Sequence, residues 1–380
     1  MRVVIAIDSL KGSLSSMDAG AAIARGVKKA FPDAETLVRP LADGGEGTID
    51  AMVYGMQGAM QTVTVCGPLG EPVTCKYGIL EDSKTAIVEM AEAAGITLVP
   101  SEQRNPLYTT TFGVGEIIKD AIQKGCRSFI VGIGGSATND GGVGMLQALG
   151  YGFLNAEGKQ VAKGALGLKE LVKITDDEVI PELKECSFKV ACDVTNVLCG
   201  ELGCSAVYGP QKGATPEMIQ EMDLWLQNYA DLAKQKYVHV NPSYPGTGAA
   251  GGLGFAFLSF MNGALDRGIQ IVLEDTKLES YIIDADVVVT GEGRLDGQTA
   301  MGKAPIGVAR LAKKHNKTVI AFAGSVTKEA TLCNENGIDA FFPILREIST
   351  LEEAMKPDVA SRNLEDTSEQ AFRLIKASRL

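Results

Sequence analysis

Charged and hydroxyl side chains gather in the glycine-rich stretches of this chain. Five such stretches stand out, at residues 8–13, 43–47, 134–142, 291–297 and 302–303. Several of them follow an apolar, β-branched run and precede a helical pattern, so glycine amides at a helix start can approach an anion closely. Acidic side chains in the same stretches would repel a phosphate unless a divalent cation lay between them. The combination favours a nucleotide–Mg²⁺ site over a simple anion site.

The first stretch places a carboxylate, two hydroxyls and an ammonium directly after the strand-like residues 3–7. In open α/β sheets, ligands bind outside the carboxyl ends of the strands. Lys11 is predicted to neutralise a transferring phosphoryl group or a substrate carboxylate. The other predicted contacts with substrate or phosphate are Asp8, Ser9 and Ser13. A loop that only caps the next helix is the alternative.

Two further stretches carry acids that could meet at one edge of the same sheet. These acids are Asp43, Glu46, Glu292 and Asp296, each in a glycine-rich loop that follows a predicted strand. Parallel strands bring such loops to one edge, and converging carboxylates suit Mg²⁺ or a general base. Solvated loop acids are the alternative for each of them.

The middle of the chain has short polar side chains between glycines. Residues 134–142 contain Ser136, Thr138, Asn139 and Asp140, a composition that can surround a small polar substrate or phosphates. Asp193 and Asn196 follow an apolar strand pattern, and Lys212 lies in a later turn. Asp193 is a candidate for a catalytic or ligand-binding role, and an acid held by backbone amides is the alternative. Asn196 and Lys212 are candidates for contacts with substrate or phosphate.

Residues 297–303 match the spacing of a phosphate-binding P-loop, but Ala304 stands where Mg²⁺ would require Ser or Thr. The stretch is also separated from its strand by residues 291–297, which makes the loop too long. We therefore expect Lys303 to contact phosphate at the start of the next helix, with a surface lysine as the alternative.

The composition excludes several classes of protein. The net charge is −11 and no basic tract exists, so nucleic acid and anionic membranes are poor partners. No window is long and apolar enough for a membrane span, and no signal peptide precedes residue 3, so we expect a cytoplasmic protein. Eight scattered cysteines indicate reduced thiols, and two histidines argue against a zinc site or a histidine-based triad. The sequence leaves open whether the chain forms a homo-oligomer.

Alternating strand and helix patterns occupy both ends of the chain, which predicts the α/β fold class with a parallel sheet. Strands are expected at residues 3–7, 35–41, 286–290, 318–323 and 340–343, and a C-terminal helix at 364–380. Near residue 58 the pattern changes to a hairpin at 61–66 and 73–80, and residues 84–90 fit either a strand or a helix start. We predict a discontinuous domain of residues 1–60 and 276–380, with a mixed α/β domain of residues 61–275 inserted.

Taken together, five motifs resemble the bacterial type 1 glycerate kinase family. They are DSLKGS from Asp8, ADGGEGT from Ala42, GIGGSATNDGG from Gly132, ACDVTN from Ala191 and TGEGRLD from Thr290. The resemblance runs from residue 1 to about residue 375. It implies an ATP-dependent kinase that converts D-glycerate to 2-phosphoglycerate in glyoxylate or glucarate breakdown. It also implies two α/β domains, one Rossmann-like, with the active site in the cleft between them.

Phosphoryl transfer requires positioning, cations against the developing charge and a group that orients the attacking hydroxyl. Lys11 and Lys303 are therefore expected to contact phosphate, and the acids of the two loops to hold Mg²⁺. Asp193 would orient or deprotonate the hydroxyl, and Arg294 would pair with the glycerate carboxylate. The open alternatives are a kinase that gives 3-phosphoglycerate, a kinase for another hydroxy acid and a non-catalytic nucleotide-binding regulator. A dehydrogenase is disfavoured because residues 8–13 lack the dinucleotide-binding fingerprint.

Overall fold

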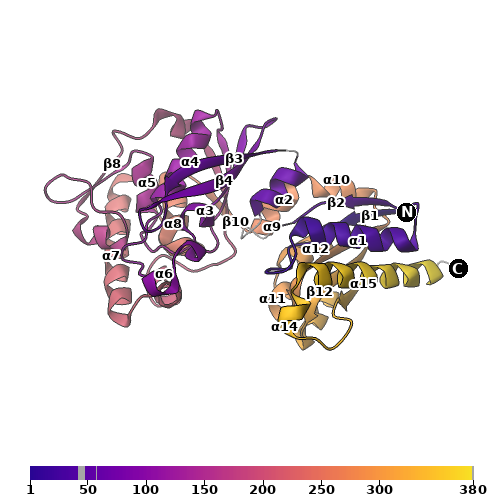
Figure 1. The fold of residues 1–380 in the computed structure, drawn as a ribbon. Helices are drawn as coiled ribbons and strands as arrows, with labels where there is room; N and C mark the ends of the chain where they lie inside the picture. Colours follow the sequence, from indigo (N-terminus) through magenta and orange to yellow (C-terminus); the bar gives the residue numbers. More distant parts are fainter. Residues whose placement is uncertain (42–47, 57, 379–380) are drawn as a thin grey trace. The chain divides into compact units, whose positions relative to one another are not determined.

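The computed structural model describes residues 1–41, 48–56 and 58–378. The chain divides into two compact units. Unit 1 comprises residues 1–43, 50–56 and 269–380, and unit 2 comprises residues 44–49 and 57–268. The indigo start and the yellow end of the chain in Figure 1 therefore belong to the same unit. The predicted α/β fold class is confirmed.

The described residues of unit 1 form a five-stranded sheet in the order β13-β12-β11-β1-β2, and every neighbouring pair is parallel. The strands are β1 (Arg2–Ile5), β2 (Glu35–Val38), β11 (Val287–Leu295), β12 (Thr318–Val326) and β13 (Ala340–Pro343). Residues 3–5, 287–289 and 319–323 of the central strands are apolar and buried, because helices cover both faces of the sheet.

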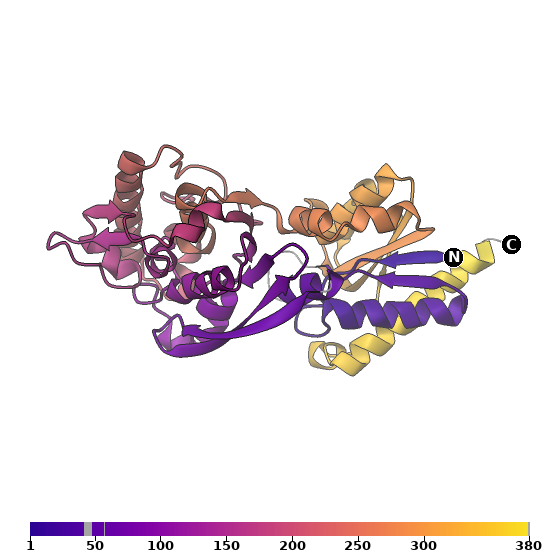
Figure 2. The same cartoon turned by 90° about the horizontal axis from the view of Figure 1, so that it is seen from above.

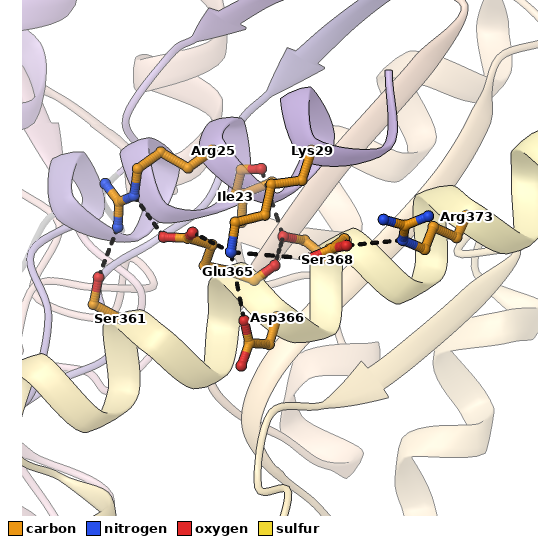
Figure 3. Close-up of polar contacts among 9 residues, drawn as sticks. Ile23, Arg25, Lys29, Ser361, Glu365, Asp366, Ser368 and Arg373 are labelled. Carbon is orange, nitrogen blue, oxygen red and sulfur yellow. Dashed lines mark hydrogen bonds and ion pairs between the residues drawn. The ribbon is translucent and has the colours of Figure 1, made fainter. Parts of the chain in front are cut away.

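One face of this sheet is covered by two helices from opposite ends of the chain. The helices α1 (Ser16–Ala30) and α15 (Pro357–Ser378) lie side by side, as Figures 1 and 2 show, and share a core with β1, β11 and β12. On their polar sides, the Arg25 Nε donates to a Glu365 carboxylate oxygen at 2.6 Å, and the Lys29 ammonium lies 2.7 Å from the other (Figure 3). The sequence predicted α15 only from residue 364, and the helix begins seven residues earlier.

The remaining helices of unit 1 connect the strands. They are α2 (Thr48–Gly55, whose first residues belong to unit 2), α9 (Gly268–Asp275), α10 (Leu278–Ile283), α11 (Gly297–Ala300), α12 (Ala304–Lys314), α13 (Leu332–Glu335) and α14 (Leu351–Ala354). Ser15 accepts a hydrogen bond from the Asp18 amide and so caps α1. Helix α12 packs on β11 and β12.

The strand β11 corrects one prediction. Residues 291–295 were expected to form a loop, but they continue the strand and pair with residues 322–326 of β12. Glycine allows this pairing because a Cβ at Gly291 would lie 1.9 Å from the Phe322 carbonyl oxygen, and the φ of Gly291 is +155°. Glu292 therefore lies on a strand and not in a loop.

The described residues of unit 2 form a six-stranded mixed sheet in the order β10-β9-β6-β5-β4-β3. The strands are β3 (Ala59–Cys66), β4 (Pro72–Leu80), β5 (Thr85–Glu89), β6 (Ser128–Gly132), β9 (Ser187–Ala191) and β10 (Ala264–Asp266). Strand β4 pairs antiparallel with both β3 and β5. Strands β5, β6, β9 and β10 pair parallel with one another in that order. The predicted hairpin is confirmed as β3 and β4, and the undecided residues 84–90 form a strand.

Helices and a small hairpin complete unit 2. The α-helices are α3 (Ala91–Ala94), α4 (Phe112–Gln123), α5 (Val143–Ala148), α6 (Cys204–Tyr208), α7 (Pro216–Lys236) and α8 (Ala249–Phe260). The hairpin is β7 (Gly152–Leu154) with β8 (Lys173–Thr175), and short 3₁₀ turns include η5 (Pro210–Lys212). Helix α8 is apolar and largely buried, although residues 250–252 in its first turn take positive φ angles. Within the described chain, every helix is too short or too polar to cross a bilayer.

Candidate functional site

A cavity of about 400 Å³ lies in unit 1, at the carboxyl ends of its parallel strands. Strand β1 lies between β2 and β11, so the chain builds the sheet in one direction from β1 to β2 and in the other from β11 to β13. Ligands of open α/β sheets bind at such a reversal of strand order. Eight of its polar lining residues are Asp8, Ser9, Lys11, Ser13, Glu292, Arg294, Asp296 and Lys303, and Ser325 and Asn363 are two more. All eight were predicted as site residues from the sequence, and the fold brings them to one cavity.

The loop after β1 is held in shape by its own hydrogen bonds. The Asp8 carboxylate is buried and accepts the Ser9 amide at 2.7 Å. Leu10 and Leu14 form an isolated antiparallel bridge, and Gly12 has a φ of +77° that favours glycine at this turn. Lys11, at the tip of this turn, is exposed. The loop therefore presents a cation at the edge of the cavity above a buried carboxylate.

Two carboxylates on the opposite wall share one hydroxyl. The Thr299 hydroxyl donates to a Glu292 carboxylate oxygen at 2.6 Å, and Asp296 accepts the amides of residues 298 and 299 at 2.9 and 3.2 Å. Asp296 thereby caps the short helix α11. The Arg294 Nε lies 3.9 Å from the second Asp296 oxygen. The wall thus holds two acids and one guanidinium within a few residues of each other.

Lys303 is the residue immediately before α12 and has no capping hydrogen bond of its own there. Helix α11 occupies residues 297–300, so the stretch before Lys303 is not a P-loop, in which a continuous loop wraps the phosphates. Lys303 nevertheless lines the cavity at a helix start, where partial positive charge favours an anion.

The residues suit Mg²⁺ by chemistry, since this hard cation takes carboxylate oxygens, and Asp8, Glu292 and Asp296 line one cavity. Among the described residues, no three acidic, histidine or cysteine side chains are already grouped as a metal site. The other two predicted metal ligands, Asp43 and Glu46, lie outside the described residues.

The predicted loop of residues 134–142 belongs to unit 2, where Asp140 organises it. The Asp140 carboxylate is fully buried and accepts the Thr111 amide at 2.8 Å, the Thr111 hydroxyl at 2.9 Å and the Gly142 amide at 3.1 Å. A further amide, of Gly144, lies at 3.3 Å. Burial raises the pKa of Asp140, and these hydrogen bonds oppose the rise. Asp140 therefore fixes the shape of the loop from inside.

Two more predicted site residues bind this loop to the turn and helix that follow β9. The Lys212 ammonium donates to the Ser136 hydroxyl at 2.8 Å and to the Thr138 carbonyl at 2.6 Å. The Asn139 amide donates to the Ser205 hydroxyl at 2.8 Å. Lys212 is 2% exposed, and burial lowers its pKa to about 8. These side chains support the loop and do not point into solvent.

Asp193 and Asn196 follow β9. Asp193 is exposed and accepts the Gly268 amide at 3.1 Å. The Asn196 side chain accepts the Tyr208 hydroxyl at 2.6 Å and donates to the Leu202 carbonyl at 3.0 Å. Of these two residues, Asp193 is the one that presents a carboxylate to solvent.

The sequence analysis missed the apolar half of the unit 1 cavity. Met355 and Asn363 line it from the region of α14 and α15, together with Leu345 and Leu351. No motif marks them, because leucine, methionine and asparagine in a helical pattern are also found wherever a helix packs. Only the arrangement of β13 and α15 around the sheet brings them to the cavity.

The comparisons with known proteins all match glycerate kinases over nearly the whole chain. The model of the glycerate kinase family matches residues 3–376. A glycerate kinase of Haemophilus influenzae is 48% identical over 99% of both chains. The glycerate 2-kinase of Escherichia coli is 48% identical over 97% of this chain and 98% of its own. A crystal structure of a provisionally assigned glycerate kinase 2 from Salmonella typhimurium LT2 has a TM-score of 0.92 and 47% identity, and covers 100% of this chain and 99% of that one.

Proposed function

Because this chain belongs to the glycerate kinase family and is thus a kinase that acts on glycerate, we propose that it transfers the γ-phosphoryl group of ATP to the 2-hydroxyl of D-glycerate. The products are 2-phosphoglycerate and ADP, and the hydroxyl proton is released. The 48% identity to a glycerate 2-kinase over almost the full length supports this position of transfer.

The observation that carries the proposal is the unit 1 cavity, in which cations and carboxylates meet at the reversal of strand order. Lys11 and Lys303 contact the phosphates of ATP and neutralise the charge that develops during transfer. The Arg294 guanidinium binds the glycerate carboxylate through two parallel hydrogen bonds. Asp8, Ser9 and Ser13 form the neighbouring wall of hydrogen-bonding groups.

Glu292 and Asp296 would hold Mg²⁺, with Asp43 and Glu46 as further ligands. When bound, the ion would screen the negative charge of the phosphates. The protein's own contribution is to keep the two carboxylates in place through Thr299, which binds both ends of the turn.

The predicted residues of unit 2 have two roles: one acts on the substrate, and the others hold the loop and turn in shape. Asp193 orients the glycerate hydroxyl and accepts its proton, since it is an exposed carboxylate after a buried strand. The remaining predicted residues keep the loop and turn that contact substrate in one shape. They are Ser136, Thr138, Asn139, Asp140, Asn196 and Lys212.

A reducing compartment such as the cytoplasm suits the protein, because all eight cysteines are free thiols in the structure. A place in glyoxylate or glucarate breakdown is the metabolic context that we propose for glycerate phosphorylation.

The test is incubation of the purified protein with ATP, Mg²⁺ and D-glycerate, followed by ³¹P NMR. A 2-phosphoglycerate signal is expected. A 3-phosphoglycerate signal would keep the kinase and move the site of transfer. A folded protein that phosphorylates neither hydroxyl of glycerate would overturn the proposal.

Asp193→Asn tests the role of the acid in the same assay. The asparagine oxygen can still accept the Gly268 amide, so the fold is preserved, but proton acceptance is lost. We expect kcat to fall by about 10²-fold or more, as removal of a general base does. Asp177→Asn, which changes an exposed acid elsewhere in unit 2, is the matched control. Equal turnover of the two variants would remove Asp193 from the mechanism.

A further inference from the structure

The unit 1 cavity has an apolar half that the phosphate chemistry leaves unused. Ile344 is buried at its base, while Leu345 and Leu351 remain 47% and 76% exposed on its wall. Large apolar side chains that remain exposed in a concave site are typical of a binding surface. A ligand that covers them would gain roughly 25 cal/mol for every Å² of apolar surface removed from water.

The apolar half of the cavity meets the half that faces the phosphates at Gly12, where Met355 lies against the loop. The terminal methyl carbon of Met355 lies 2.7 Å from the position that a Cβ at Gly12 would occupy. Gly12 therefore lets the methionine pack directly against the loop that carries Lys11. One ligand that spans both halves must have an apolar end and an anionic end a short distance apart.

A single amide group completes the apolar half. The Asn363 side chain on α15 lines the cavity, and within the described chain it has no hydrogen-bond partner. A carboxamide offers a donor and an acceptor side by side, which match the amino group and ring nitrogen at an adenine edge. The corresponding edge of guanine presents two acceptors, so it can accept a bond from the amide NH₂ but cannot donate one to the amide oxygen.

We propose that the surface formed by Ile344, Leu345, Leu351, Met355 and Asn363 binds the adenine base of the nucleotide, with the phosphates directed to Lys11 and Lys303. The base stacks on the leucine and methionine side chains, and Asn363 selects adenine over guanine. This inference rests on the proposed function for its choice of a nucleotide as the ligand.

The first test compares two ligands in the full-length protein with Mg²⁺ present. The Kd values of ATP and of inorganic tripolyphosphate, which has no base, are measured by calorimetry for the wild type and for Leu345→Ser/Leu351→Ser. We expect the variant to bind ATP about tenfold more weakly and tripolyphosphate equally well. Ile348→Ser is the matched control, because Ile348 is fully exposed on the same segment and does not line the cavity. Unchanged ATP binding, or equal weakening of both ligands, would overturn the proposal.

Asn363→Ala provides a second test that does not depend on the leucines. We expect the ratio of the Kd for GTP to the Kd for ATP to fall by about tenfold in this variant, because one bidentate contact to a base contributes discrimination of that order. An unchanged ratio would contradict the role of Asn363.

The two proposals fail separately. If the wild type binds ATP through this surface but does not phosphorylate glycerate, the base site stands and the proposed function fails. If it phosphorylates glycerate and KM for ATP is the same in Leu345→Ser/Leu351→Ser, the function stands and the base site fails.

Discussion

The Lys212 ammonium is buried on two oxygen acceptors, and its titration should be visible in the stability of the protein. Burial lowers its pKa to about 8 from an ordinary 10.5. Between these values the unfolded chain binds the proton and the folded chain does not, so the free energy of unfolding rises with pH. Below pH 8 both states are charged and the contribution is constant. From pH 8 to 10, the free energy of unfolding of the wild type, measured with urea, should rise by about 2 kcal/mol more than that of Lys212→Met.

Lys159→Met is the control for this measurement, since Lys159 is exposed in the same unit. Its unfolding free energy should follow that of the wild type across the same pH range. If Lys212→Met also follows the wild type, the ammonium is not buried in solution as it is in the structure.

At the level of single residues, the sequence predicted the polar wall of the unit 1 cavity because its members follow strands of one parallel sheet. The same reasoning could not distinguish Lys212 from Lys303. Both are lysines in glycine-rich turns, but Lys212 is buried by partners at positions 136 and 138, far away in the sequence. Asn363 was missed because its position at the cavity depends on the packing of α15.

Among the secondary-structure elements, α1 and α15 pack closely against each other at Gly26. A Cβ at Gly26 would lie 2.0 Å from the Ser368 hydroxyl oxygen and 2.2 Å from the Glu365 carbonyl oxygen. In an exposed helix, Gly→Ala stabilises by up to about 1 kcal/mol. Here we expect the sign to reverse, with a loss of about 2 kcal/mol or more in urea unfolding, because the helices must separate. Gly55→Ala, where nothing lies within 4 Å, should be neutral or stabilising.

The ion pairs on the polar side of this helix contact predict acid sensitivity. Hydrogen bonds from Lys29 and then Arg25 hold the pKa of Glu365 below its ordinary 4.5. A carboxylate with a depressed folded pKa contributes stability above the unfolded pKa and loses it as pH falls through the folded value. Glu365→Gln should therefore lower the thermal midpoint at pH 7 by a few degrees, and its difference from the wild type should be smaller at pH 3. Scanning calorimetry at both pH values would test this. Repeating it with about 0.5 M salt, which screens exposed ion pairs, should reduce the difference at pH 7. An equal difference at both pH values would contradict it.

The order of elements was predictable where strand and helix patterns alternate, as in both arms of unit 1. It was not predictable at β11, because the glycines of residues 291–293 are also typical of a loop. Whether they pair is decided by β12, which presents eight residues in register to that strand. Likewise the first turns of α15 lack a clear apolar stripe in sequence, and they become helical because they continue a helix that packs on α1.

At the scale of the whole chain, unit 2 is almost one continuous segment, whereas unit 1 needs both chain ends. Residues 58–268 carry the complete mixed sheet and its own apolar core. A fragment of these residues should therefore fold alone, with a cooperative thermal transition by circular dichroism.

The segment 269–380 gives the matched contrast, since it contains β11, β12 and β13 but not β1 or α1. Without β1, the edge of β11 loses its parallel partner, and the apolar face of α15 loses the helix against which it packs. We expect this segment to be unfolded alone. Joining residues 1–56 to 269–380 through a flexible linker should restore a cooperative transition. A folded 269–380 segment would mean that β1 and α1 are not required for the core of unit 1, and a 58–268 fragment that binds hydrophobic dye without a transition would show that unit 2 cannot fold independently.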